Sequence, residues 1–241
     1  MYRELDPERI IATLATLGQR IEERFPASGL GRVGRELLAL ASESKELLDR
    51  LRRPNAVLRT GVGVGVLALV ALAVATALSV RVSLQVQNIS DLLQGLDAGV
   101  NDVIFMGIAI YFLLTVEGRL KRRRALRALH ELRSVAHIID MHQLTKDPDR
   151  FLLREPDTPS SPQRTMTRFE LSRYLDYCSE LLSHVSKLAA LHAQYLADPV
   201  VLDAVNDVET LADGLSRKIW QKIMILDAIG PADAPVPPGG R

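Results

Sequence analysis

The chain has 241 residues, of which 47% are hydrophobic and 24% are charged, and its formal net charge is +1. This near-neutral balance argues against a general nucleic-acid-binding protein. The single cysteine, Cys178, excludes an intramolecular disulfide and any CxxC metal or redox motif. Charged residues precede the first apolar run, so we expect no signal peptide and an internal helix that directs membrane insertion.

Residues 1–56 are predicted to form two amphipathic helices. Residues 6–8, Asp-Pro-Glu, are typical of a helix start, because Asp caps the end, Pro fits the first position and Glu complements the helix dipole. Apolar residues then recur at three- and four-residue steps over residues 10–21, and again over a second helix at about residues 32–53. Pro54 separates this second helix from the apolar run that follows.

Residues 60–80, TGVGVGVLALVALAVATALSV, carry no charge. A helix of about 21 residues covers a hydrocarbon core of roughly 30 Å, and this one lacks the polar face of a soluble surface helix. We therefore predict a membrane-spanning helix, the first of a two-helix transmembrane hairpin over residues 57–118.

Small residues follow one line along the first span: Gly61, Gly65, Ala68, Ala75 and Ser79. Small side chains let helix backbones approach closely, and close packing favours helix association in lipid. The pattern predicts a packing face, against either the second span or another copy of the chain. The alternative is that Gly and Ala are simply frequent in membrane helices.

A second span is predicted over residues 98–118, with Asn101 and Asp102 in its first turn and Glu117 in its last. Its uncharged part is only about 14 residues long, which alone would also suit a buried soluble helix. Two spans are the better interpretation, because the charged residues then lie at the two interfaces. The connecting outer loop, 81–98, begins with a short apolar–polar alternation that would suit a strand paired with another copy. We favour a frayed continuation of the helix there, followed by a short interfacial helix.

Basic residues flank both spans on one side, whereas residues 81–97 contain one Arg and two Asp. The positive-inside rule then places both termini in the cytoplasm. We also expect the membrane to be a plasma or inner membrane, in a bacterium. The run after the second span can also bind anionic lipid headgroups, or it can be a topology signal only. Its members are Arg119, Lys121, Arg122, Arg123 and Arg124.

Residues 119–229 are predicted to form a cytoplasmic helical bundle. A long helix continues the second span, a Pro-rich loop follows at 147–166, and two helices then form an antiparallel hairpin. A capping-box motif at residues 167–170 marks the start of the hairpin, and Asp198-Pro199 ends its first helix and caps the second. Apolar residues then recur from Val201 to Leu226 in the second helix. The tail at 230–241 is rich in Pro and Gly and is expected to be disordered. The fold class is all-α.

The histidines are the only candidate site residues for chemistry. His130 and His137 lie on one helix face, Asp140 is one turn from His137, and His192 lies on an apolar stripe of the next helix. If the helices pack, these four can converge on a metal ion, as inward-facing carboxylates and imidazoles do in other bundles. The Glu-x-x-His pair of di-iron bundles and the HExxH motif are absent, however, and a histidine on an apolar stripe is more often a hydrogen-bonded core residue.

From this pattern we expect a non-enzymatic integral membrane protein that is a membrane-anchored helical assembly or interaction module, with no cofactor. The expected partners are the lipid bilayer, other copies of the chain in a homo-oligomer with bundle or coiled-coil packing, and a cytoplasmic protein. Two alternatives stay open: a homo-oligomeric pore or channel subunit, and a histidine-based metal-binding enzyme or sensor.

Overall fold

The computed structural model describes residues 4–83, 89–148 and 166–228. These residues are helical, with short connections and no strand in the three described ranges. The prediction of an all-α chain is confirmed, and two helices are long and apolar enough to cross a membrane. The predicted tail at 230–241, most of the Pro-rich loop and part of the outer loop lie outside the described residues.

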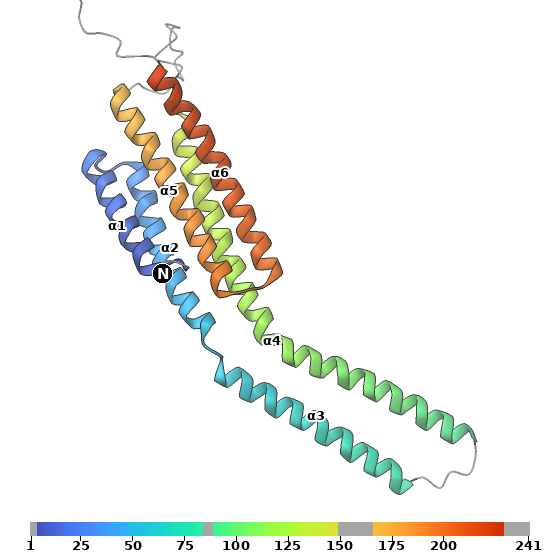
Figure 1. The fold of residues 1–241 in the computed structure, drawn as a ribbon. Helices are drawn as coiled ribbons and strands as arrows, with labels where there is room; N and C mark the ends of the chain where they lie inside the picture. Colours follow the sequence, from blue (N-terminus) through green and yellow to red (C-terminus); the bar gives the residue numbers. More distant parts are fainter. Residues whose placement is uncertain (1–3, 84–88, 149–165, 229–241) are drawn as a thin grey trace, which may run out of the picture. The chain divides into compact units, whose positions relative to one another are not determined.

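The described helices are shown in Figure 1: α1 (Pro7–Arg24), α2 (Gly29–Arg52), α3 (Ala56–Ser83), α4 (Ile89–Leu144), α5 (Arg168–Tyr195) and α6 (Pro199–Ala228). The chain divides into two compact units. We call Arg52–Arg124, which contains α3 and the first part of α4, the two-helix unit. The described parts of Met1–Leu51 and Ala125–Arg241, which contain α1, α2, the rest of α4, α5 and α6, are the five-helix unit.

Side-chain caps fix three helix starts at the predicted residues. The Asp6 carboxylate accepts hydrogen bonds from the backbone N–H of residues 8 and 9, at 3.0 and 3.3 Å. At α5 the Thr167 hydroxyl accepts from the backbone of Glu170 at 3.2 Å, and the Glu170 carboxylate accepts from the backbone of Thr167 at 2.8 Å. The Asp198 carboxylate caps α6 in the same way, at 3.0 Å. Each cap satisfies backbone donors that a helix end leaves unpaired.

Two helix starts differ from the prediction. α2 begins at Gly29 rather than near residue 32, because the Ser28 hydroxyl accepts a hydrogen bond from the backbone of Gly31 at 3.1 Å. α4 begins at Ile89, so the expected interfacial helix and the second span are one helix, and Asn101 and Asp102 lie well inside it. The reason is that no proline interrupts residues 89–144. Upstream, α3 continues to Ser83, which confirms helix rather than strand at the start of the outer loop.

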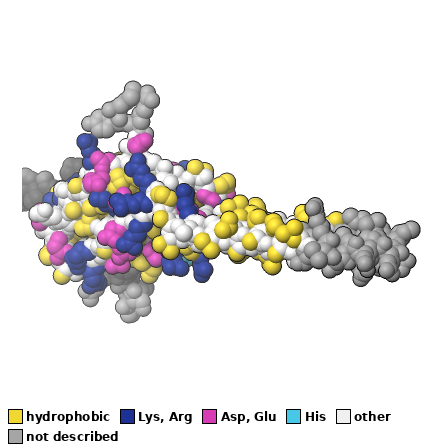
Figure 2. All heavy atoms as spheres, turned by 90° about the horizontal axis from the view of Figure 1, so that it is seen from below, with side chains coloured by type: hydrophobic (Ala, Val, Ile, Leu, Met, Phe, Trp, Pro, Cys, Tyr) yellow, Lys and Arg dark blue, Asp and Glu magenta, His cyan; other side chains and the backbone are white. Residues whose placement is uncertain are grey.

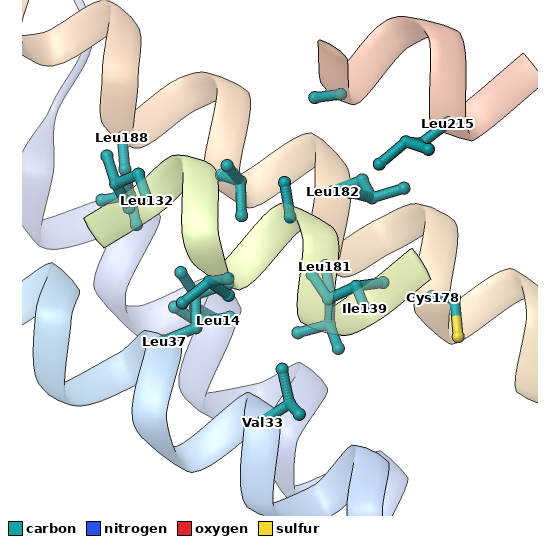
Figure 3. Packing of buried hydrophobic residues seen from close by; sticks show 14 of the residues in the cluster. Leu14, Val33, Leu37, Leu132, Ile139, Cys178, Leu181, Leu182, Leu188 and Leu215 are labelled. Atoms are coloured by element: carbon teal, nitrogen blue, oxygen red, sulfur yellow. The ribbon is translucent and has the colours of Figure 1, made fainter. Parts of the chain in front are cut away.

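The core of the five-helix unit is built from one apolar stripe on each helical segment (Figure 3). Its labelled members include Leu14 on α1, Leu37 on α2, Leu132 on α4, Leu182 on α5 and Leu215 on α6. These side chains are at most 5% exposed. Fully burying one such side chain stabilises the folded state by about 1.5–3 kcal/mol, so these stripes are what holds the unit together.

The two-helix unit has no such core, since none of its described side chains is buried. Large apolar side chains lie on its surface, among them Leu67 (72% exposed), Leu72 (60%) and Phe105 (69%). Figure 2 shows hydrophobic side chains gathered over the described part of this unit. A continuous apolar surface of this kind is typical of a segment that is covered by lipid or by other proteins.

Candidate functional site

The most strongly connected polar group of the two-helix unit is the Glu117 carboxylate on α4. One of its oxygens accepts a hydrogen bond from Arg59 Nε on α3 at 2.9 Å. The other lies 2.9 Å from Lys121 Nζ and accepts from the backbone N–H of Asn55 at 3.4 Å. Asn55 also caps α3 through its own side chain, which accepts from the backbone of Leu58 at 3.2 Å. We call Asn55, Arg59, Glu117 and Lys121 the ionic junction.

The ionic junction joins the two predicted spans through charge-assisted hydrogen bonds, which are stronger than neutral ones. The Glu117 side chain is only 18% exposed, whereas that of Arg59 is 65% exposed. A half-buried carboxylate is stable when cations and N–H donors surround it, and Glu117 has all of these. The sequence predicts Glu117 at the membrane–water interface but predicts no partner for it. The four-residue spacing of Glu117 and Lys121 was the one local signal for the junction.

A groove of about 540 Å³ lies beside the ionic junction and follows α3 and α4 away from it. Its lining is apolar except for one charged end: Leu58, Arg59, Val62, Gly63, Val66, Leu67, Val70, Leu113, Leu114 and Glu117. Gly63 leaves space on its wall, because a Cβ atom at that position would meet no atom within 4 Å. One end of the groove is therefore charged, where Arg59 and Glu117 line it, and the rest of its length is lined by apolar residues.

Among the members of the predicted small-residue face whose side chains are described, Gly65 is the one that lies against α4. A Cβ atom at Gly65 would lie 3.4 Å from Leu113 Cδ1 on α4. Gly61, Ala68 and Ala75 are exposed, and the side chain of Ser79 lies outside the described part of the chain. The half-buried face of α3 is instead a neighbouring one, formed by Leu58, Val62, Gly65, Val66, Leu69 and Ala73.

The predicted basic run divides between two environments. Lys121 belongs to the ionic junction, and the Arg119 guanidinium lies over the Phe112 ring, 4.9 Å from its centroid. Arg122 is half-buried, while Arg123 and Arg124 are exposed. Exposed guanidinium groups directly after an apolar helix can contact anionic headgroups or water equally well.

The four predicted metal-site residues are not brought together. His130 and His137 are exposed, and Asp140 is half-buried and accepts a hydrogen bond from Gln143 Nε2 at 2.6 Å. His192, by contrast, is completely buried. Among the described residues no three His, Cys, Asp or Glu side chains form a group that could hold a metal ion.

His192 is a buried, neutral histidine. Its Nδ1 lies 3.0 Å from the carbonyl oxygen of Leu188, so Nδ1 carries the proton and donates it. Its Nε2 is buried without a hydrogen-bond partner among the described residues. Burial lowers the pKa of His192, because the surrounding apolar core disfavours the charged imidazolium.

This lowered pKa predicts a loss of stability in mild acid. Below about pH 6.5 the unfolded chain takes up a proton at His192 that the folded chain does not, so the free energy of unfolding falls as the pH drops. We expect a lower urea midpoint at about pH 5.5 than at about pH 7.5, and a smaller difference in His192→Gln. The same substitution at exposed His137 is the matched control, and an equal effect there would contradict the assignment to His192.

Cys178 is also buried, and burial raises the pKa of its thiol to about 12. The neutral thiol is a poor nucleophile, so Cys178 is a small apolar core residue. We expect a maleimide to leave the folded protein unlabelled at neutral pH and to label it fully in urea. A Ser134→Cys variant, which places a thiol on an exposed position of α4, controls for reagent activity. Rapid labelling of the folded wild type would show that Cys178 is accessible.

No family model, curated protein or solved structure matches this chain.

Proposed function

We propose that this protein is a non-enzymatic, membrane-anchored helical module that assembles with further copies of itself in the bilayer. Its α3 and the first part of α4 span the membrane, and the five-helix unit lies in the cytoplasm together with both termini. The apolar surface of the two-helix unit supports the membrane placement, and basic residues at the ends of both spans support the topology.

The observation that carries self-assembly is the outward direction of the small residues on α3. Gly61, Ala68 and Ala75 are exposed, while α4 covers the adjacent face at Gly65. Lipid tails are as apolar as leucine, so helices associate in a bilayer where small residues allow close packing. The outward face of α3 supplies such positions for another copy of the chain.

The test is the mass of the full chain in mild detergent, measured by light scattering and by cross-linking. We expect an oligomer in the wild type, and a shift toward monomer in Gly61→Leu and Ala68→Leu. Gly107→Leu on α4 is the matched control, because Gly107 is also exposed and a side chain there meets nothing. A monomeric wild type, or an equal shift in the control, would overturn self-assembly.

The same preparation separates the other two functional classes. Concentration-dependent ion leak from liposomes, abolished in Gly61→Leu, would instead favour a pore-forming oligomer. Metal bound to the purified protein and lost in His192→Ala would favour a histidine-based site. Neither result is expected for an assembly module.

A further inference from the structure

We propose that the groove between α3 and α4 binds an anionic phospholipid, with one acyl chain along its apolar length and the phosphate at Arg59. The proposal rests on the membrane placement given above, but it does not require self-assembly. It assigns a ligand of defined chemistry to a defined position in the two-helix unit.

The apolar part of the groove has the form that an acyl chain requires. Val62, Val66 and Val70 repeat at four-residue steps along one side of α3, and Leu113 and Leu114 contribute from α4. None of the side chains that line the groove is buried, so the groove is open to its surroundings and a ligand can enter it from the side. Gly63 widens the groove further, because its position opens onto free space.

The polar end of the groove carries the donors that a phosphate requires. Arg59 uses Nε for Glu117, and a guanidinium has four further N–H donors. Among the described residues the guanidinium of Arg59 has no partner other than Glu117, and the side chain is 65% exposed. The planar guanidinium can therefore hold Glu117 with one edge and phosphate oxygens with another.

Charge favours an anionic lipid over other occupants of the groove. Residues 52–59 contain three arginines and residues 117–124 contain five basic residues, against the single carboxylate of Glu117. Lys121 and Arg59 already neutralise that carboxylate. A phosphodiester headgroup at Arg59 offsets this local excess of positive charge, and its attached chain continues into the apolar part of the groove.

The experiment compares spin-labelled phosphatidylglycerol with spin-labelled phosphatidylcholine in phosphatidylcholine vesicles that contain the full-length protein. We expect the motionally restricted fraction to favour phosphatidylglycerol, and the preference to fall roughly tenfold in Gly63→Leu and in Arg59→Gln. Gly63→Leu fills the groove but leaves the ionic junction intact. Gly107→Leu and Arg123→Gln are the matched controls for bulk and for charge, and both should retain the preference.

Each contrary result points to a different cause. An equal loss in Arg123→Gln would show diffuse attraction to the basic run, and an unchanged preference in Gly63→Leu would place the lipid outside the groove. Full competition by inorganic phosphate would mean a phosphate site without a chain. Failure of the protein to enter the vesicles would overturn the proposed function itself, whereas insertion without a lipid preference would overturn only the present inference.

Discussion

Replacing Leu181 by alanine is expected to lower the free energy of unfolding of the five-helix unit by about 3 kcal/mol. Leu181 is 0% exposed on α5, and its side chain is among the labelled core residues of Figure 3. α2 approaches it closely, because a Cβ atom at Gly34 would lie 4.0 Å from Leu181 Cδ2. Shortening this side chain leaves a cavity between α2 and α5 that the rigid helices cannot fully close, so the cavity term adds to the lost burial.

The measurement is urea unfolding of the full chain in mild detergent, followed by far-UV circular dichroism. Leu144→Ala is the matched control, because Leu144 undergoes the same chemical change on α4 at a position that is 61% exposed. We expect the control to shift the free energy of unfolding by less than about 0.5 kcal/mol. Similar losses in the two variants would mean that Leu181 does not belong to the core of the folded protein.

Local sequence signals predicted the helices and their buried stripes. The four apolar positions from Ile10 to Ile21 and the eight from Val201 to Leu226 are the buried residues of α1 and α6. A helix that packs on one side must repeat its apolar residues near every 3.6 positions, so this information is contained in a short window. Caps are equally local, which is why three of the helix starts were predicted to the residue.

The ionic junction could not be predicted in this way. Arg59 and Glu117 are 58 positions apart, and only the pairing of α3 with α4 brings them within hydrogen-bond distance. The face of α3 that packs against α4 could not be predicted either. A helix that is apolar on all sides has no polar face, so its sequence does not show which side is buried. The small residues indicated a neighbouring face, and only Gly65 belongs to both.

The predicted convergence of the histidines required the face of α4 that carries His130 and His137 to point into the core. A shift of one residue turns a side chain by about 100° around a helix. Ala136 is therefore buried while the adjacent His137 is exposed. His192, which did lie on an apolar stripe, is the one histidine of the predicted set in the core.

Introducing arginine at Leu72 is expected to disfavour membrane insertion of α3 by about 3 kcal/mol, on the order of a hundredfold in the insertion equilibrium. Leu72 lies near the middle of the uncharged run and is 60% exposed, on a side of α3 that α4 does not cover. The Glu117 carboxylate is not available to pair with an arginine at this position, because it is held at the ionic junction. The guanidinium must then either lie in hydrocarbon or draw the helix out of it.

Resistance to alkaline carbonate extraction measures this effect directly, since a protein that spans the bilayer stays in the membrane fraction. Val57→Arg provides the control: it adds the same charge to α3, but next to the basic end, where the long side chain can reach the headgroups. We expect Leu72→Arg to appear in the extracted fraction and Val57→Arg to stay with the membrane. Extraction of the wild type would show that lipid does not cover the apolar surface of the two-helix unit. The proposed topology and the proposed phospholipid site would then both be wrong.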